Sequence, residues 1–188
     1  MHVFKKFVKY YKPYQSVFWM DMFCALLVSA VDLAFPQILN WATKDLFAHG
    51  AQAIYRILPW MAIGLLVMYF LRFLGRYYIT YQGHVMGARM ESDMRQDLFD
   101  HFQRLSFSYY DRNNTGEMMS KLVSDLFDIS ELAHHGPENI FISLLKILGS
   151  FALLLWINVP MTLILAAVTL IMLLFCIDQN KKMRAVFM

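Results

Sequence analysis

Four long apolar stretches dominate the pattern of hydrophobic and polar positions along the chain. They cover residues 16–41, 57–81, 137–157 and 161–177, and each has the roughly 17–25 residues that a helix needs to cross the hydrocarbon core of a bilayer. Between the third and fourth stretches, Asn158-Val159-Pro160 leaves room only for a tight hairpin. The pattern therefore predicts an all-α membrane protein with four transmembrane helices.

The more polar segment between the second and third stretches, residues 82–136, keeps a helical period. No proline occurs between Trp60 and Gly136, and apolar side chains recur every three or four residues at Met86, Met90, Met94, Leu98, Phe102 and Leu105. The second helix is therefore expected to continue from residue 57 to about Leu105, a length of roughly 73 Å at about 1.5 Å per residue. Because the bilayer core takes up only about 30 Å, the remaining ~40 Å would project out of the membrane.

The segment that leads back to the membrane, from Asn114 to Pro137, is also predicted to be helical. Asn114 is a suitable N-cap, and Glu117 follows it three residues later as in a capping box. Apolar residues then recur at helical spacing as far as Pro137, where Gly136-Pro137 is expected to bend the helix near the membrane surface. A long helical hairpin, here called the stalk, is thus predicted over residues 82–136.

A short aromatic segment joins the two arms of the stalk. Ser106 is expected to cap a short transverse helix that ends near Asn113. The side chains of Phe107, Tyr109 and Tyr110 would lie ~40 Å from the membrane, where only protein can bury them. They are expected to contact a protein partner, and the alternative is that they pack the two arms against each other.

The composition agrees with a membrane protein. Of the 188 residues, 59% are hydrophobic and 16% are charged, and the mean hydropathy is +0.43, whereas a soluble domain usually carries about 25% charged residues. The net charge is +3, and no stretch of Lys and Arg is dense enough for a nucleic-acid surface. The expected partner is the lipid bilayer, not a nucleic acid.

The distribution of Lys and Arg predicts the orientation in the membrane. Twelve of these residues lie in the N-terminal segment, the stalk and the C-terminal end, against two, Lys44 and Arg56, in the loop after the first span. Loops that are rich in Lys and Arg face the cytoplasm. Both termini and the stalk are therefore expected to be cytoplasmic in a multi-pass protein of the cell membrane.

Five charged residues lie within or at the edges of the spans: Asp21, Asp32, Arg72, Arg76 and Lys146. Each is costly in hydrocarbon unless it is paired or faces a wet cavity. From their depth, Asp32 is expected to pair with Lys146, and Asp21 with Arg76; separate exposure of each charge to water is the alternative. Arg72 and Arg76 are four residues apart and share a helix face, which would suit the anionic headgroup of a substrate in an inner cavity.

Candidate metal ligands and catalytic residues are few. His134 and His135 lie near Glu131 and Glu138, but polar residues at the cytoplasmic end of a helix are expected to be solvated, so no metal site is predicted. Both cysteines sit in apolar stretches, where cysteine behaves as a small hydrophobic residue. No Ser/His/Asp arrangement stands out, so no catalytic residue is predicted.

A specific motif occupies the tip of the stalk and the residues after it. Tyr109-Tyr110-Asp111 is followed by Thr115-Gly116-Glu117, two methionines, Ser120-Lys121-Leu122 and then Asp125. This order resembles the first cytoplasmic loop of ABC exporters, in which an aromatic pair and Asp precede Thr-Gly-Glu/Asp, two apolar residues and Ser-Arg-Leu. Lys121 stands where that family usually has Arg, which keeps the charge but lacks the planar fork of a guanidinium.

The resemblance covers nearly the whole chain and implies the first part of a six-helix exporter membrane domain. Residues 1–15 would be an N-terminal elbow, with Lys12-Pro13-Tyr14 as its similar motif, and residues 16–188 a partial type 1 transmembrane domain. The domain would dimerise with a second protomer, as a homodimer or a heterodimer. The residues implied to contact a nucleotide-binding domain are Phe107, Tyr109, Tyr110, Asp111 and Arg112, and the loop motif behind them comprises Thr115, Gly116, Glu117, Ser120, Lys121 and Asp125.

The function that the resemblance implies is ATP-driven export of a lipid, peptide or drug-like substrate. ATP and Mg²⁺ would be bound by the nucleotide-binding domain, in the same chain or a separate one. None of the eight glycines fits the phosphate-loop pattern Gly-x-x-x-x-Gly-Lys-Ser/Thr, so no cofactor and no ATP hydrolysis by this chain are expected, and the fifth and sixth spans would lie outside it.

Two alternative functions stay open at this point. The first is a stand-alone four-helix secondary transporter with Asp32 as its ion-coupling residue, a class in which short loops are usual. The second is a non-transporting membrane adaptor whose stalk tip binds a soluble partner. Co-purification with an ATPase would favour the exporter over both.

Overall fold

The computed structural model describes residues 2–46 and 51–187 of the chain. All regular elements in these two ranges are helical, and no strand occurs in them. The chain forms two compact units, residues 1–145 and residues 146–188.

The first unit begins with a short helical elbow. It consists of α1 (His2–Lys9) and the 3₁₀ turn η1 (Lys12–Tyr14), which has proline in its first turn, where the missing N–H of proline costs nothing. The apolar helix α2 (Gln15–Trp41) follows directly and ends at the residue that was expected to end the first span. A π-type turn, η2 (Ala42–Leu46), closes this part.

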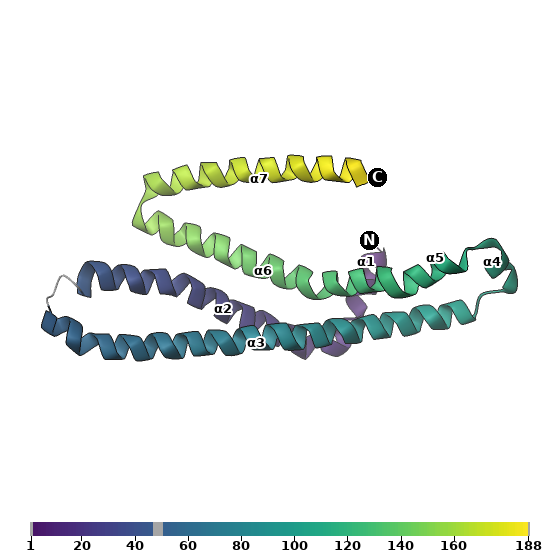
Figure 1. The fold of residues 1–188 in the computed structure, drawn as a ribbon, viewed down its shortest axis with the longest axis horizontal. Coiled ribbons are helices and arrows are strands. Elements are labelled where there is room, and N and C mark those ends of the chain that lie inside the picture. The colour runs from purple at the N-terminus through teal and green to yellow at the C-terminus, as the bar shows by residue number, and fades with distance from the viewer. Residues whose placement is uncertain (1, 47–50, 188) are drawn as a thin grey trace. The chain divides into compact units, whose positions relative to one another are not determined.

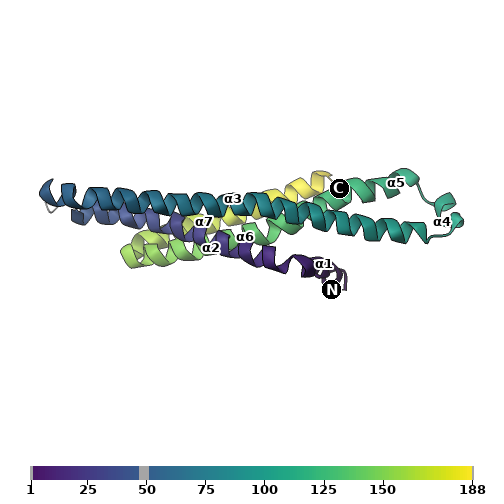
Figure 2. The ribbon, with the colours of Figure 1, turned by 90° about the horizontal axis from the view of Figure 1, so that it is seen from below.

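Helix α3 (Ala51–Gln103) is one unbroken rod of 53 residues, or about 80 Å at 1.5 Å per residue. It ends two residues before Leu105, the predicted end. In Figures 1 and 2 it runs beside α2 over one part of its length and beside the return arm over the other. The prediction that the second apolar helix continues far beyond the ~30 Å of a bilayer core agrees with this length.

The return arm consists of three helical pieces without a gap. They are α5 (Thr115–Ser120), the π-type turn η4 (Lys121–Asp125) and α6 (Leu126–Ile157), which continues through Pro137. The Asn114 side chain caps α5, because its Oδ1 accepts a hydrogen bond from the backbone N–H of Gly116 at 2.8 Å. Glu117 does not complete a capping box; its carboxylate binds Lys121 instead, at 2.8 Å.

The two arms meet through α4 (Phe107–Arg112), the expected short helix at the stalk tip. Figure 1 shows α4 beyond the C-terminal end of α3, at the opposite end of that helix from Ala51. Ser106 is the N-cap residue by position, but its hydroxyl makes no capping bond and pairs with the Ser108 hydroxyl at 2.9 Å. The side-chain cap predicted for Ser106 is therefore wrong.

The second unit contains the end of α6 and the helix α7 (Val159–Phe187). Only Asn158 separates the two helices. Its Oδ1 accepts the backbone N–H of Met161 at 3.1 Å, and its backbone oxygen accepts the Thr162 hydroxyl at 2.7 Å. These bonds satisfy groups at the start of α7 and explain the abrupt turn that the sequence predicted.

The described part of the first unit has two small cores. One consists of Cys24, Ala25, Val28 and Ile79, where α2 packs on α3. The other consists of Met86, Met90 and Ala133, and aromatic residues of the elbow cover it. Most large apolar side chains outside these cores are exposed, among them Leu66 at 71% and Ile140 at 70%. Such extensive apolar exposure suits a helix that faces lipid.

Four helical segments are long and apolar enough to cross a membrane: Lys6–Lys44, Ile54–Gln103, Thr115–Ile157 and Val159–Ala185. Together with the absence of strands in the described ranges, they confirm the predicted all-α class with four candidate spans. The chain is thus a multi-pass membrane protein.

Candidate functional site

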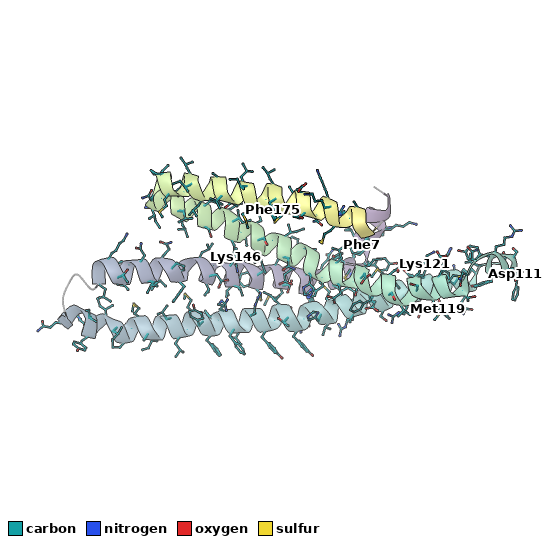
Figure 3. All side chains as sticks on the ribbon, turned by 45° about the horizontal axis from the view of Figure 1, so that its top comes forward. Phe7, Asp111, Met119, Lys121, Lys146 and Phe175 are labelled. Carbon is teal, nitrogen blue, oxygen red and sulfur yellow. The ribbon has the colours of Figure 1, made fainter. Side chains whose placement is uncertain are left out.

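The tip of the stalk presents an aromatic and charged surface to solvent. Phe107 has 89% of its side chain exposed, and Tyr109, Asp111 and Arg112 are exposed beside it. Figure 3 shows Asp111 at the extreme end of the hairpin. A phenylalanine this exposed gains nothing from the fold of the stalk itself, so its surface is available to a partner.

Tyr110 behaves differently from Phe107. It is half-buried, and its hydroxyl donates a hydrogen bond to the backbone oxygen of Phe102 at 2.5 Å. Its ring lines a small cavity of about 150 Å³ together with Phe102, Met118 and Leu122. The alternative considered from the sequence, that the aromatic residues pack the two arms together, therefore holds for Tyr110 and not for Phe107.

The loop-motif residues lie on the outside of the return arm: Thr115, Gly116, Glu117, Ser120, Lys121 and Asp125 are all exposed. The Lys121 ammonium donates to the Glu117 carboxylate at 2.8 Å, one helical turn away. This hydrogen bond and the charge of the partner lower the pKa of Glu117 and raise that of Lys121. Lys121 is thus engaged within its own helix, and the motif forms a solvated face next to α4 and not a closed pocket.

The elbow is fastened to both arms by three tyrosine hydroxyls, which the sequence analysis missed. On α3, Tyr10 donates to Asp97 at 2.7 Å and Tyr14 donates to Asp93 at 2.9 Å.

On α6, the Tyr11 hydroxyl donates to the backbone oxygen of Ala133 at 2.7 Å. Burial and the bond to the Asp97 carboxylate raise the pKa of Tyr10 to about 12. Tyr14 follows Tyr10 by four residues and Tyr11 by three, which are the spacings of side chains that share a helix face, and this spacing was a usable signal.

Inside the candidate spans, Arg72 forms an ion pair with Asp32. Its Nε donates to the Asp32 Oδ1 at 2.7 Å, and both side chains are about two-thirds or more buried. Arg72 also lies 5.9 Å from the ring centre of Tyr69. Lys146 is the first residue of the second unit, so its expected pairing with Asp32 stays a prediction.

The expected pair of Asp21 with Arg76 is wrong. Asp21 is only 1% exposed, and neither of its carboxylate oxygens has a hydrogen-bond partner among the described residues. Arg76 is exposed, because Gly75 and Ile79 are the residues of that turn that lie buried against α2, and Arg76 is rotated by about 100° from Gly75. Two charges at the same depth in the membrane can therefore fail to pair, because they can lie on different faces of their helices.

Three histidines meet between the two arms of the stalk. His84 of α3 joins His134 and His135 of α6, and the ligand nitrogens of all three lie within 4.8 Å of one another. The expectation that the histidines of α6 are solvated is wrong for His134, which is 3% exposed, and Glu138 is likewise only 5% exposed. His84 was not singled out from the sequence, since it lies 50 residues away from its neighbours.

Comparison with known proteins gives a consistent result. Residues 18–187 match the family model described as the ABC transporter transmembrane region. The chain is 41% identical over 183 residues to the uncharacterized ABC transporter ATP-binding protein YwjA of Bacillus subtilis, across 97% of this chain and 31% of that protein.

Two further relatives extend the comparison. The chain is 31% identical to the uncharacterized ABC transporter ATP-binding protein YknU of Bacillus subtilis, across 89% of this chain and 28% of that protein. It is 24% identical to the ATP-dependent lipid A-core flippase of Thiobacillus denitrificans, across 97% and 31%. The chain therefore spans about a third of the length of these relatives.

Proposed function

The chain belongs to the ABC transporter transmembrane family, and from this premise we propose that its stalk couples ATP-driven movement of a nucleotide-binding domain to export across the cell membrane. The chain supplies four helices of an exporter membrane domain. The nucleotide-binding domain, in the same or a separate chain, binds ATP and Mg²⁺. Family membership favours this function over a stand-alone secondary transporter or an adaptor.

The exposure of Phe107 is the observation that carries the proposal. The side chain is 89% exposed at the end of an arm, whereas Tyr110 beside it is packed against α3. Large aromatic anchors that fill a pocket of the partner dominate the binding energy of many interfaces. We infer that Phe107 is such an anchor, with Tyr109, Asp111 and Arg112 at its rim.

The two arms are suited to transmit a push or pull from this contact. α3 has no break between Ala51 and Gln103, and a bond between the arms, from Arg95 Nε to the Leu122 backbone oxygen at 3.1 Å, ties it to the return arm. A pair of stiff, joined helices moves as a rigid body, as in hinge-type transitions. Closure of the nucleotide-binding domains would thus tilt the membrane ends of α3 and α6.

We propose that the substrate is an amphipathic, lipid-like molecule with an anionic headgroup. The name of the flippase relative refers to a lipid, and Arg76 is an exposed cation on α3. Arg72 is already engaged by Asp32, so Arg76 is the better headgroup contact of the two. We propose further that the termini and the stalk lie in the cytoplasm and that two protomers form the transport unit.

Replacement of the anchor tests the coupling role. In membranes that contain the assembled transporter, Phe107→Ala is expected to weaken docking of the nucleotide-binding domain by about 2 kcal/mol, or roughly 30-fold in Kd. Substrate-stimulated ATP hydrolysis should fall with it. The measurements are ATPase rate against substrate concentration and the yield of a cysteine cross-link between α4 and the nucleotide-binding domain.

Phe127→Ala is the matched control. Phe127 is 54% exposed on the same stalk but away from the tip, so its loss should leave both readouts unchanged. If the Phe107→Ala protein shows the same substrate-stimulated ATPase rate and cross-link yield as the Phe127→Ala protein, α4 does not transmit the movement.

A further inference from the structure

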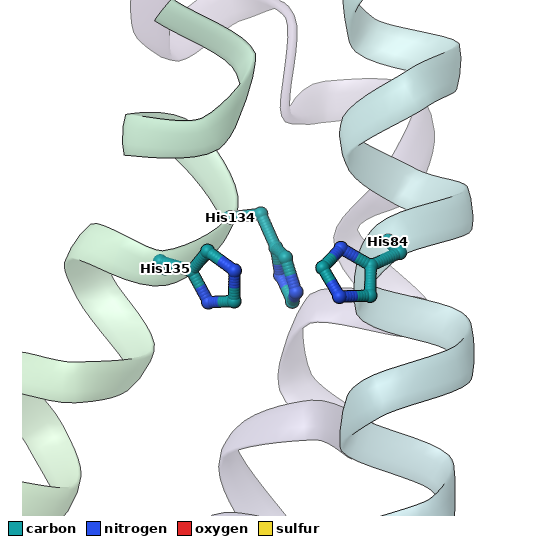
Figure 4. A group of neighbouring side chains, drawn as sticks. All are labelled: His84, His134 and His135. Atoms are coloured by element: carbon teal, nitrogen blue, oxygen red, sulfur yellow. The ribbon is translucent and has the colours of Figure 1, made fainter. Parts of the chain in front are cut away.

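The three imidazoles of His84, His134 and His135 form one compact cluster. Their ring centres are separated by 4.9 Å between His84 and His134, 5.2 Å between His84 and His135, and 4.4 Å between His134 and His135. Figure 4 shows the three rings side by side, one from α3 and two from α6. Adjacent residues of a helix usually diverge by about 100°, so two neighbouring histidines aimed at one point on another helix are a specific arrangement.

Helix α3 makes room for the central ring. A Cβ atom on Gly83 would lie 1.8 Å from the His134 Cε1, so any side chain at this position would displace the ring. One turn later, a Cβ on Gly87 would meet the His134 Cβ at 3.4 Å. The two glycines form a groove that seats His134 against the backbone of α3, and one nitrogen of its ring lies within 4.8 Å of a nitrogen of each of the other two histidines.

One ring nitrogen of His134 is buried at this position without a hydrogen-bond partner among the described residues. The residue is 3% exposed, and its Nδ1 has no hydrogen-bond partner in the described part of the chain. A buried polar atom without a partner costs about 1–3 kcal/mol. A ligand that accepts the lone pair of this nitrogen would remove that cost, and a metal ion does so directly.

Two carboxylates lie near His135, at distances slightly longer than a hydrogen bond. Nε2 of His135 lies 3.5 Å from Glu131, and its Nδ1 lies 3.8 Å from Glu138. Whichever nitrogen binds a metal, the other stays beside a carboxylate that can orient the ring and raise its basicity. The negative charges also offset part of the charge of a divalent cation.

Space for a further ligand adjoins the histidines. A cavity of about 220 Å³ is lined by His84, His134, Glu91 and Glu131. This volume accommodates a water molecule or a swung-in carboxylate as the fourth donor of a tetrahedral ion. His84 is exposed, so an ion can reach the cluster from solvent.

We propose that His84, His134 and His135 bind a divalent transition-metal ion, with Zn²⁺ as the best match, and that the ion clamps α3 to α6 at the base of the stalk. Imidazole donors suit Zn²⁺ better than they suit Mg²⁺ or Ca²⁺, which select oxygen ligands. Zn–N bonds of about 2.0–2.1 Å in a tetrahedral ion place the nitrogens roughly 3.4 Å apart. The nitrogens lie within 4.8 Å of one another, so metal binding requires the three rings to approach one another. This site is independent of the proposed coupling role.

Metal titration of the full chain tests the site. The protein carries no affinity tag, is held in phospholipid nanodiscs, is stripped with a chelator, and is titrated with Zn²⁺ against a fluorescent zinc indicator. One Zn²⁺ per chain is expected, with a Kd of about 1 μM or tighter. Co²⁺ in place of Zn²⁺ should give the visible absorption of a tetrahedral nitrogen-ligated ion.

Two substitutions distinguish Zn²⁺ binding at the histidine cluster from nonspecific binding at the surface. His84→Ala is expected to weaken Zn²⁺ binding at least ~30-fold, and since the side chain is exposed, helicity and the unfolding midpoint without metal should not change. His101→Ala is the matched control on the same helix, because His101 is exposed and outside the cluster. It should bind Zn²⁺ like the parent.

Gly83→Ala provides a second, ligand-preserving test. It keeps all three histidines but moves the His134 ring, so it should also weaken binding about tenfold or more. Zn²⁺ should raise the unfolding midpoint of the parent and not that of His84→Ala, as a bridging ion requires. Equal Zn²⁺ affinity of the parent and His84→Ala, or uptake of less than one Zn²⁺ per chain at ~10 μM free metal, overturns the proposal.

Discussion

At the scale of single residues, the ion pair of Asp32 and Arg72 holds α2 to α3 within the candidate spans. The contact of 2.7 Å is made by side chains that are 24% and 35% exposed. Partial exposure weakens such a pair relative to a fully buried one, but hydrocarbon around it makes an unmatched charge costly. Removal of the guanidinium would leave the Asp32 carboxylate without this donor.

We expect Arg72→Met to lower the free energy of unfolding by about 2 kcal/mol, measured by denaturant titration in detergent micelles. Arg76→Met is the control on the same helix, one turn away and exposed, and it should change stability by less than ~0.5 kcal/mol. Equal effects of the two substitutions would show that the pair does not stabilise the fold.

At the scale of elements, the elbow, α3 and α6 meet in the core that contains Met86, Met90 and Ala133. The three helical segments come from parts of the chain that are far apart, and the tyrosines of the elbow add hydrogen bonds around the same core. Met90 is fully buried there, with no exposed surface. The elbow thus belongs structurally to the stalk and not only to the first span.

Met90→Ala is expected to destabilise the first unit by about 2–4 kcal/mol, because it removes packed side-chain atoms and leaves a cavity. Met119→Ala is the matched control, since Met119 is 55% exposed on the return arm. The readout is the unfolding midpoint, followed by limited proteolysis of the elbow. A Met90→Ala protein as stable as Met119→Ala would contradict the assignment of this core.

The elements were accessible from the sequence because hydropathy and helical period act locally. The long helix through Met86, Met90 and Met94, the cap at Asn114 and the turn at Asn158 all depend on neighbours within a few residues. The short helix α4 was likewise expected from the polar residues that flank it, Ser106 and Asn113, although the side-chain cap predicted for Ser106 does not form. These features need no knowledge of which helix lies beside which.

The contacts between helices could not be predicted from local sequence patterns. Asp21 and Arg76 were paired by depth alone, although the pairing also depends on how each helix is rotated about its axis. His84 could be linked to α6 only through packing. One signal was present: Gly83 and Gly87, four residues apart, mark a face where another helix approaches closely.

At the scale of the whole molecule, the chain has one predicted topology: stalk and termini on the cytoplasmic side. The prediction rests on the excess of Lys and Arg in those segments. It places α4 on the side of the membrane where ATP is found. The beginning of α3 would then lie on the outer side.

Cysteine labelling in intact cells checks this topology. Gln52→Cys, at the start of α3, should react with a membrane-impermeant maleimide in intact cells, whereas Ser108→Cys, in α4, should react only after permeabilisation. Both positions are exposed. The parent protein, with its buried Cys24 and its Cys176 in an apolar helix, gives the background. Labelling of Ser108→Cys before permeabilisation would reverse the topology.

Because α3 is unbroken, a movement at either of its ends is transmitted to the other. A continuous helix of 53 residues turns a tilt of a few degrees at one end into a displacement of about 3 Å some 40 Å away, and it does so equally from either end. Under the proposed coupling, any free energy that ATP-bound domains contribute at α4 to favour one arrangement of the membrane helices must be returned to ATP binding by a substrate that favours the same arrangement. The proposal therefore implies that a cargo molecule in the bilayer would act as an effector of nucleotide affinity.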